Sequence, residues 1–428
     1  MKKTSAFLFL AFLLTLPAWS QEKAATFMVF SDPHYYDPSL GTTGSAFENY
    51  LNDDRKLLRE SDELIREAIA LVSASDASFV LIPGDLTKDG TRVSHSRMAE
   101  YLKEMEETGR RVFVVPGNHD VLNGEAMSYR GDSAIRVANI SPDDFSSIYK
   151  DFGYGEALER DPSSLSYLAE AAPGLWLLAL DACRYRENAE HGHPITDGKF
   201  GPETLNWVKK ILALAREQNK EVIVMMHHGV VEHYRGQEKN YGEYLVDDYP
   251  AIGRMLAENG VRVVFTGHYH AQDIAMNRFD KQNFLVDVET GSLVTYPCPV
   301  RTITMKENVM TVRSAFIGSI PSHPNDFQNF AREYVLNGIA GIAEKTLIGM
   351  HLRPQDAAKL SSQVALAFCT HYAGDEPGTD KPLDLHGVNL LGRFIISFRK
   401  SLVKGLYTDI EPTDNRLRIN LNDGSWEL

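Results

Sequence analysis

Residues 112–120 read VFVVPGNHD, a short apolar run that is followed at once by a turn and by polar side chains. The same layout recurs in TFMVFSDPH at 26–34, FVLIPGD at 79–85, VIVMMHH at 222–228 and VRVVFTGHYH at 261–270. Short apolar runs bounded by turn residues are typical of buried strands. We therefore predict strands at residues 26–30, 79–82, 112–115, 175–180, 222–226 and 261–265.

Segments of helical periodicity separate these strands, and this alternation is typical of an α/β protein. From residue 272 to residue 315 the pattern changes to strands without helices, with a hairpin around residues 306–308. We expect these strands to form a second sheet that packs on the first, which gives a two-sheet β-sandwich flanked by helices. The predicted helices of this part cover residues 55–72, 92–107, 203–214 and 248–258.

The last quarter of the chain has a different pattern. The turn-rich stretch PSHPN at residues 321–325 precedes helical periodicity at 326–341, 354–370 and 391–406. The sequence therefore predicts a C-terminal helical appendage that ends in an irregular tail.

Ionisable and amide side chains follow five of the predicted strands. Open α/β sheets place ligand sites at the carboxyl ends of their strands, so we expect these side chains to converge. The candidates are Asp32, His34, Asp85, Asn118, His227, His268 and His270.

The chemistry of this set favours metal ions. Imidazole, carboxylate and amide oxygen together suit zinc, manganese or iron. Seven ligands are too many for one tetrahedral ion, but two ions that share a bridging carboxylate would use them all. Two ions about 3.5 to 4 Å apart stabilise both the attacking and the leaving oxygen of a phosphoryl displacement. Gly84, Gly117 and Gly267 precede ligands at strand ends, where we expect a side chain to block the turn or the approach to the metals.

In chain order, D-x-H, G-D, G-N-H-D, H and G-H-x-H resemble the motif set of the calcineurin-like metallophosphoesterases, a family that includes cyclic-nucleotide phosphodiesterases and purple acid phosphatases. The resemblance covers residues 25–315, with small variations at Pro33 and Gly229. It implies a four-layer αββα fold, a catalytic domain at 21–319 and a mainly helical domain at 320–428. It also assigns Asp32, His34 and His270 to one ion, Asn118, His227 and His268 to the other, and Asp85 to both as the bridge.

The resemblance further implies the roles of two residues that are not ligands. His119 is similar to the family's histidine beside the scissile phosphate, where it would stabilise charge or protonate the leaving group, and Asp120 would hold its tautomer. A hydroxide that bridges the two ions would be the nucleophile.

Several neighbouring residues allow two interpretations. His228 competes with His227 as a ligand, although His227 matches the family position and His228 fits a supporting role better. Tyr35, Tyr269 and Arg184 would line the substrate pocket or merely pack beside it. We interpret Asp181 as a structural polar residue at a sheet end, and His95, His191, His193 and His233 as solvated side chains.

The sequence HYAGD at residues 371–375 follows a predicted helix. One hypothesis is that it caps the mouth of the active site and limits substrate size. The alternative is a helix end with a glycine stop signal.

The N-terminal residues predict export. Lys2 and Lys3 precede an apolar run at 6–16 and small residues near position 20, which is the layout of a signal peptide at 1–20. The apolar run is shorter than the ~18 residues of a spanning helix, so we expect a periplasmic or secreted protein without stable membrane insertion. Loss of the two lysines would change the formal net charge from -14 to -16, which disfavours nucleic-acid polymers but allows a small phosphorylated substrate.

The composition and the cysteines set broader limits. With 43% hydrophobic residues the chain can bury a large core. Cys183, Cys298 and Cys369 are widely spaced and form no disulfide framework, so we expect buried thiols or at most one pair.

The function expected from the sequence is an exported hydrolase of a small phosphodiester or phosphomonoester with two divalent ions, zinc or manganese in preference to iron. The alternatives are an exported nucleotidase or sugar-nucleotide hydrolase, and a non-catalytic metal-binding receptor of the same fold. The sequence leaves the oligomeric state open.

Overall fold

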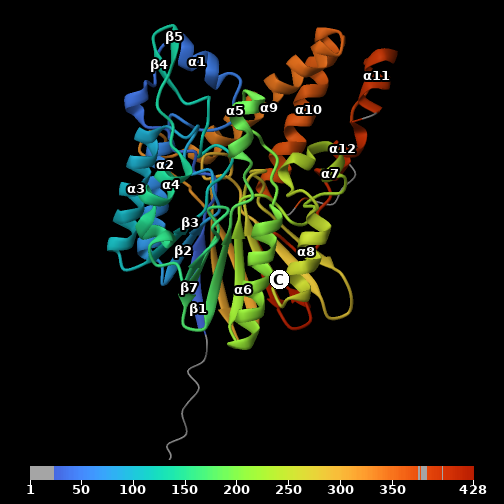
Figure 1. Cartoon of the computed structure of the whole chain (residues 1–428). Coiled ribbons are helices and arrows are strands. Elements are labelled where there is room, and N and C mark those ends of the chain that lie inside the picture. The colour runs from blue at the N-terminus through green and yellow to red at the C-terminus, as the bar shows by residue number, and fades with distance from the viewer. Residues whose placement is uncertain (1–23, 375, 377–382, 398) are drawn as a thin grey trace, which may run out of the picture.

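Two mixed β-sheets of seven strands each form the centre of the molecule in a computed structural model (Figure 1). The structure describes residues 24–374, 376, 383–397 and 399–428. The predicted signal peptide lies outside the described residues.

The first sheet has the strand order β16-β15-β14-β13-β1-β2-β3, and the second has the order β11-β12-β10-β9-β8-β7-β6. In the first sheet β1, β2 and β3 are parallel, and in the second β8, β9, β10 and β12 are parallel. A separate hairpin pairs β4 with β5. The strands of the first sheet are β1 Ala24–Val29, β2 Phe79–Ile82, β3 Arg111–Val114, β13 Pro299–Lys306, β14 Val309–Phe316, β15 Arg416–Asn420 and β16 Trp426–Glu427; those of the second are β6 Glu159–Arg160, β7 Tyr167–Ala172, β8 Leu175–Leu180, β9 Glu221–Met226, β10 Val263–Thr266, β11 Asp273–Arg278 and β12 Phe284–Glu289; the hairpin strands are β4 Met127–Arg130 and β5 Ser133–Arg136.

All six predicted strands are present, with ends shifted by at most two residues. The expectation that residues 272–315 form a sheet of their own is wrong. β11 and β12 join β10 in the second sheet, whereas β13 and β14 pair with β1 in the first. The predicted hairpin at residues 306–308 is confirmed, since Lys306 pairs with Val309.

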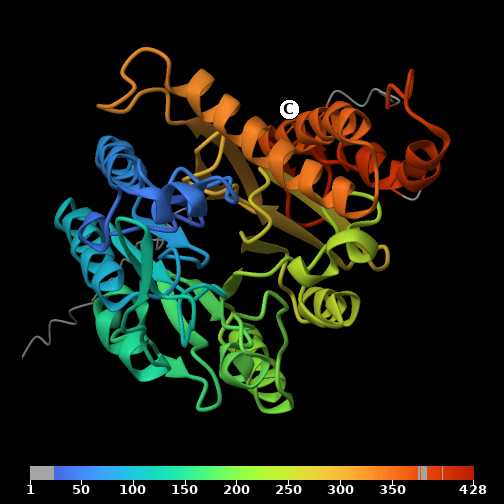
Figure 2. The ribbon, with the colours of Figure 1, turned by 90° about the horizontal axis from the view of Figure 1, so that it is seen from above.

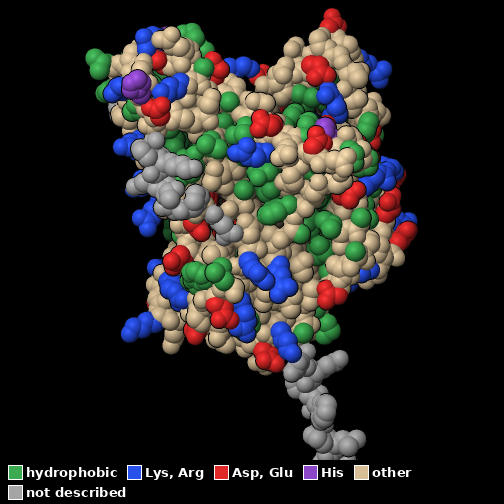
Figure 3. Space-filling view, turned by 180° about the vertical axis from the view of Figure 1, so that it is seen from behind, with side chains coloured by type: hydrophobic (Ala, Val, Ile, Leu, Met, Phe, Trp, Pro, Cys, Tyr) green, Lys and Arg blue, Asp and Glu red, His purple; other side chains and the backbone are tan. Residues whose placement is uncertain are grey.

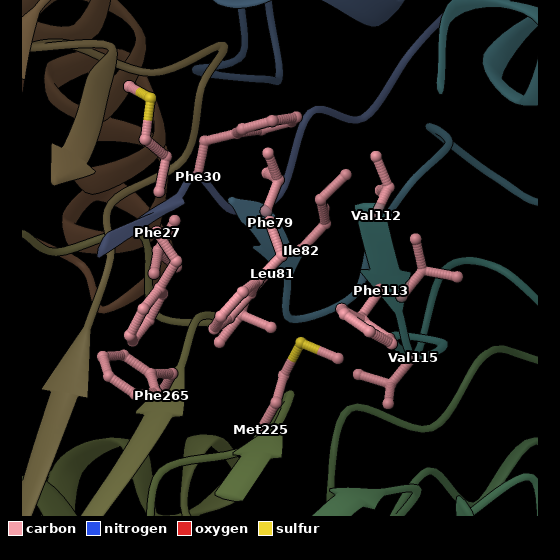
Figure 4. Close-up of a cluster of buried hydrophobic side chains, with 14 of the residues drawn as sticks. Phe27, Phe30, Phe79, Leu81, Ile82, Val112, Phe113, Val115, Met225 and Phe265 are labelled. Atoms are coloured by element: carbon pink, nitrogen blue, oxygen red, sulfur yellow. The ribbon is translucent and has the colours of Figure 1, made fainter. Parts of the chain in front are cut away.

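The hydrophobic core lies between the two sheets. Phe27 of β1 stacks on Phe79 of β2, with ring centroids 4.5 Å apart, and meets the edge of Phe265 on β10 at 5.3 Å. Figure 4 shows Phe265 and Met225 of the second sheet facing the side chains of β1, β2 and β3. Strands buried on both faces need no polar alternation, which explains the continuous apolar runs of β2, β8 and β10.

Helices cover the outer face of each sheet and complete four layers. In Figure 1, α2 and α3 flank the first sheet and α6 and α8 flank the second. The predicted α/β sandwich with flanking helices is therefore confirmed. The helices of this part are α1 Ser45–Leu51, α2 Ser61–Ala74, α3 Arg92–Glu107, α4 Pro142–Ile148, α5 Asn188–His191, α6 Pro202–Glu217, α7 Gln237–Tyr241 and α8 Tyr249–Glu258, with short helical turns at Pro38–Leu40, Lys150–Tyr154, Tyr185–Glu187 and Gly242–Tyr244.

One helix begins later than its periodicity predicts. α2 starts at Ser61 and not at residue 55, because the Asp54 carboxylate accepts the backbone N–H groups of Arg55 and Lys56. A side chain that occupies backbone donors in this way competes with the helix.

The C-terminal helices stand over the end of the sandwich at which β1 finishes (Figures 1 and 2). α9 and α10 pack against each other. Val335 of α9, Phe368 of α10 and Leu402 of α12 share a buried cluster with Tyr234 and Tyr269 of the sandwich. The helices are α9 Phe327–Gly349, α10 Pro354–Ala373, α11 Leu390–Ser397 and α12 Lys400–Gly405.

The end of the chain is not the irregular tail that the sequence predicts. β15 pairs antiparallel with β14, and β16 pairs with β15, so both extend the first sheet. Leu417 and Ile419 are buried in the main core. The boundary at residue 320 therefore stays a prediction, because the chain leaves the sandwich and then returns to it. Among the described residues, no helix has both the length and the apolar character required to cross a bilayer.

Candidate metal centre

The loops after β1, β2, β3, β9 and β10 meet at one end of the sandwich. Several of their polar residues adopt the left-handed backbone conformation that side chains rarely take, which the surrounding structure must enforce. These residues, with their φ angles, are Asp32 (49°), His34 (37°), Asp85 (49°), His268 (78°) and His270 (68°).

A first group of four buried donors comes together there. One ligand atom each from Asp32, His34, Asp85 and His270 lies within 4.8 Å of the others. The Nε2 atoms of His34 and His270 are 3.1 Å apart, and His34 Nε2 is 3.5 Å from Asp85 Oδ2.

A second group lies directly beside the first. Donor atoms of Asp85, His227 and His268 lie within 4.8 Å of one another. His227 Nε2 is 3.3 Å from Asp85 Oδ2 and 3.2 Å from Asn118 Oδ1, so the amide also faces this group.

Asp85 belongs to both groups, and its Oδ2 faces a histidine of each. In the first group, the Nε2 atoms of His34 and His270 face each other and the neighbouring carboxylate oxygens. The ligands of a common cation are arranged in this way. The donor set of nitrogen and oxygen fits zinc, manganese or iron. All seven residues singled out in the sequence therefore lie around two adjoining positions that fit two ions.

The charges of the site follow from its burial. Burial would raise the pKa of Asp85, yet His227, His119 and His34 hold it well below its usual value. Burial and the nearby Lys56 ammonium lower the pKa of His34 well below its usual value. Burial likewise lowers the pKa of His268 and of His270. An ionised carboxylate beside neutral imidazoles, as Asp85 is beside His34 and His268, is the state that binds a metal ion. Burial would lower the pKa of His227 too, but Asp85 raises it to about 9.

Glycines allow the close approach of these loops. A Cβ on Gly117 would lie 2.1 Å from Asp85 Oδ1, and a Cβ on Gly267 would lie 2.3 Å from Asp32 Oδ2. Both positions therefore exclude a side chain, as the sequence predicts.

Hydrogen bonds outside the site also orient the ligands. His227 Nδ1 donates to Pro83 O at 2.8 Å, and this bond leaves His227 Nε2 facing Asp85.

His119 lies at the rim of the site, with its ring centroid 4.9 Å from that of His34. The predicted pairing of His119 with Asp120 is wrong. His119 Nδ1 lies 3.0 Å from Asp89 Oδ1, and Asp89 is held in turn by the ammonium of Lys88. Burial would lower the pKa of His119, but Asp85 and Asp89 raise it above its ordinary value.

Asp120 has a structural role. Its carboxylate accepts the backbone N–H groups of Leu86, Thr87 and Gly117 at 2.9 to 3.0 Å. These bonds join the loop after β2 to the loop after β3. Burial and the neighbouring Asp85 raise the pKa of Asp120 to about 7.

The remaining histidines divide into buried and exposed side chains. His228 is not in either donor group, and its Nε2 bonds Thr196 O at 2.8 Å, which agrees with a supporting role. The interpretation of His95 and His233 as solvated is wrong, because both are fully buried. Solvated His191 and His193 are confirmed as exposed.

The structure also shows the contacts of the other ambiguous side chains. Tyr35 is buried and packs its ring against Tyr101, so it does not line a pocket. Arg184 pairs with Glu187. Asp181 accepts bonds from the Leu165 and Cys183 backbones and from the Tyr185 hydroxyl, which confirms its structural role at the sheet end. Cys183, Cys298 and Cys369, all among the described residues, are unpaired thiols, two of them buried and Cys183 partly so.

Sequence reasoning missed Asp89 and Lys56. Asp89 lies four residues after Asp85 in the same strand-end loop, and this proximity was a usable signal. Lys56 is 9% exposed and lies close enough to lower the pKa of His34 and of His270. Its position beside the centre is set by the turn before α2, and the periodicity had placed it in a helix.

A cavity of about 340 Å³ lies between the sandwich and the C-terminal helices. It adjoins the metal centre, because the ring of Tyr244 in its wall lies 4.5 Å from the ring of His268. From behind, the molecule is notched along its upper edge, between the C-terminal helices and the β4–β5 region (Figure 3). The cavity wall includes Arg55, Tyr244 and Tyr269 from the sandwich and Ile339, Phe368 and Tyr372 from the helices.

The model of the calcineurin-like phosphoesterase family matches residues 25–272, which is more than half of the chain. The chain therefore belongs to the calcineurin-like phosphoesterases, and the resemblance noted in its motifs is confirmed. Members of this family are metal-dependent hydrolases of phosphoesters, and the two donor groups of this chain agree with that class.

Solved structures resemble this fold at low sequence identity. A dimetal phosphatase from Danio rerio is 20% identical, with a TM-score of 0.50, over 68% of this chain and 96% of that chain. A purple acid phosphatase from yellow lupin (Lupinus luteus) seeds is 13% identical, with a TM-score of 0.44, over 70% of this chain and 53% of that chain. No curated protein sequence matches the chain.

Proposed function

We propose that this chain hydrolyses a small phosphodiester or phosphomonoester with two divalent metal ions. The observation that supports this proposal most is the position of Asp85, whose carboxylate faces both donor groups. A carboxylate shared in this way is the device that brings two ions to within a few ångströms. We propose zinc or manganese before iron, because the donors are nitrogen and oxygen.

Two ions, when bound there, supply the Lewis acidity that activates a water molecule and neutralises the phosphate. The residues of the chain do the rest. Lys56 lies near the donor groups and brings a positive charge to an anionic substrate. Asp89 accepts the Nδ1 proton of His119, which leaves Nε2 of His119 free to give a proton to the leaving oxygen.

The cavity beside the centre supports a substrate with a bulky apolar or aromatic group. Its walls are formed by tyrosines, a phenylalanine and aliphatic side chains, together with Arg55 and Arg399. Such walls bind a planar or apolar group by burial, while the two arginines favour an anionic ester. A nucleotide fits the same description, so a nucleotidase or nucleotide-sugar hydrolase remains the second candidate.

Metal analysis combined with hydrolysis of bis(4-nitrophenyl) phosphate tests the catalytic proposal. We expect metal bound at the centre, turnover that is lost on chelation and recovered with Zn²⁺ or Mn²⁺, and loss of turnover in Asp85→Ala. Bound metal without turnover on any phosphoester would instead favour a binding protein. Comparison of 4-nitrophenyl phosphate, bis(4-nitrophenyl) phosphate, nucleotides and nucleotide sugars then separates monoester, diester and nucleotide specificity.

We also propose that the chain is exported to the periplasm or the medium, on the layout of residues 1–20. N-terminal sequencing of the protein recovered from a cell fractionation tests this. A mature protein that begins near residue 21 would support export, whereas an intact Met1 on cytoplasmic protein would contradict it.

A further inference from the structure

A second buried group of imidazole and carboxylate side chains lies apart from the seven ligands described above. Asp273 is the first residue of β11, His371 lies in the last turn of α10, and Glu376 follows that helix. Their exposed fractions are 1%, 1% and 6%. One donor atom of each lies within 4.8 Å of the other two. The proposed reaction uses none of the three residues.

The surroundings of this group are rich in buried carboxylates. Five buried carboxylates gather there. His233 pairs with Asp273, Asp287 and Glu289, and His371 pairs with Asp273 and Glu376. The guanidinium of Arg301 donates to the backbone carbonyls of Asp273, Glu289 and Asp414. Burial raises the pKa of one of them, Glu289, to about 8, against the opposing effect of His233, and Asp273 and Asp287 add to the rise. The carboxylates belong to Asp273, Asp287, Glu289, Glu376 and Asp414.

Donor atoms of the group lack hydrogen-bond partners. Asp273 Oδ2, Glu376 Oε2 and His371 Nε2 have none among the described residues. His233 Nδ1 bonds the other Asp273 oxygen, Oδ1, at 2.8 Å, and this bond fixes the carboxylate with Oδ2 at 3.7 Å from His371 Nδ1. The same nitrogen of His371 contacts Glu376 Oε1. Asp273 Oδ2, His371 Nδ1 and Glu376 Oε1 therefore face one another, while His233 orients the Asp273 carboxylate.

We propose that Asp273, His371 and Glu376 bind a third divalent transition-metal ion. Two carboxylates and one imidazole make the mixed oxygen and nitrogen donor set that zinc and manganese accept. A divalent cation would use Asp273 Oδ2, a buried oxygen that faces His371 and has no hydrogen-bond partner among the described residues.

The third ion joins the C-terminal helices to the catalytic sandwich. Tyr372, the residue after His371, lines the cavity. Its hydroxyl accepts a hydrogen bond from Arg55 Nε at 3.0 Å, and its backbone carbonyl accepts one from Gln272 N at 3.3 Å. On the sandwich side, Ala271 N donates to Glu289 at 3.2 Å, directly after the ligand His270. An ion bound here fixes the end of α10, and with it the cavity wall, without touching the substrate.

The test is the metal content of the full chain. Protein stripped by chelation is reloaded with Zn²⁺, freed of excess ion and measured by inductively coupled plasma mass spectrometry. We expect three zinc ions per chain in the wild type and two in His371→Gln and Asp273→Asn. His386→Gln, which removes an exposed imidazole from the same part of the chain, is the matched control and retains three. Two ions in the wild type, or three in both cluster variants, overturns the proposal.

A second measurement covers the case in which a cluster variant fails to fold. Anomalous diffraction at the zinc edge from wild-type crystals should give a peak between Asp273, His371 and Glu376, and its absence overturns the proposal. The peak should persist in Asp85→Asn, whatever that variant does to turnover, so the third site and the proposed reaction fail or hold independently. In folded His371→Gln we expect KM for a bulky diester to rise severalfold while kcat changes less.

Discussion

At the scale of single residues, the partner of His119 is the main difference between sequence and structure. Asp120 is adjacent in the chain, but the turn after β3 directs its carboxylate to three backbone N–H groups. Asp89, thirty residues earlier, reaches His119 because the β2 and β3 loops lie side by side. The two aspartates therefore have different surroundings: Asp120 joins two loops, and Asp89 contacts the histidine to which we assign the proposed proton transfer.

We predict that Asp89→Asn lowers kcat on bis(4-nitrophenyl) phosphate by about tenfold or more, because the amide no longer stabilises the His119 imidazolium. A positioned general acid contributes roughly 100-fold or more to the rate. Metal content and unfolding free energy should change little. Asp120→Ala is the matched control. It leaves three buried N–H groups without an acceptor and should lower the unfolding free energy by several kcal/mol, at ~1 to 3 kcal/mol per group. Equal effects of both variants on kcat and on stability would contradict this division.

We predict that His95 makes the fold sensitive to acid. It is fully buried between the Tyr149 hydroxyl and the Asp120 carbonyl, and burial lowers its pKa to about 3 despite the Asp120 carbonyl. In the unfolded chain the pKa returns to about 6.5, so the unfolded state binds the extra proton between pH 6.5 and pH 3. Because that proton favours unfolding, stability should fall with decreasing pH by about 1.4 kcal/mol per unit from this group.

Urea unfolding of wild type and His95→Gln from pH 7 to pH 4 measures this contribution. The variant has no imidazole to protonate, so its stability should depend less steeply on pH by about that amount. Parallel pH profiles of the two proteins would show that His95 does not keep its neutral form in the folded state.

At the scale of elements, the last two strands of the chain belong to the first sheet of the sandwich, so the catalytic part does not end before the C-terminal helices. β15 adds to β14 after about a hundred residues of helices and loops, and it carries Leu417 and Ile419 into the main core. A truncation at residue 321 would remove these side chains together with the helices, so it would not isolate the role of the helices.

We predict that Ile419→Ala lowers the unfolding free energy by about 2 to 5 kcal/mol, the usual cost of emptying a core position. Arg418→Ala changes the neighbouring residue, whose side chain is exposed and pairs with Glu427, and should cost less than ~1 kcal/mol. Chemical denaturation monitored by tryptophan fluorescence gives both values. If Ile419→Ala were as mild as Arg418→Ala, the final strand would not belong to the cooperative core.

At the scale of the whole molecule, the cavity exists only because two distant parts of the chain meet. Phe368 of α10 contacts Tyr241 of α7, with ring centroids 5.9 Å apart, and both line the cavity. The first ligand-bearing strand and these helices are separated by some three hundred residues of sequence. The glycine stop predicted in residues 371–375 is confirmed, because α10 ends at Ala373 with Gly374 at its C-cap. Asp375 lies outside the described residues, and the capping hypothesis stays a prediction.

We predict that Phe368→Ala raises KM for bis(4-nitrophenyl) phosphate about tenfold, which corresponds to the ~1.5 kcal/mol or more that a buried aromatic side chain contributes. The KM of methyl 4-nitrophenyl phosphate, which has the same leaving group and a small second substituent, should change little. Ile348→Ala, an exposed position on α9, is the control and should alter neither value. An equal rise in KM for both esters would argue that the cavity does not receive the second substituent.

The sequence by itself determined six of the strands, the approximate positions of the flanking helices and the seven candidate donor residues that the fold brings together. Burial on both faces of a parallel sheet requires continuous apolar runs, and the carboxyl ends of such strands must converge, so local patterns carry this information. It did not determine the pairing of β13 and β14 with β1, the return of β15, the partner of His119 or the burial of His233. Each of these depends on which segments become neighbours after folding, and no periodicity in the chain records that. The cavity and the cluster of Asp273, His371 and Glu376 have the same origin, because their members come from separate elements that only the tertiary structure brings together.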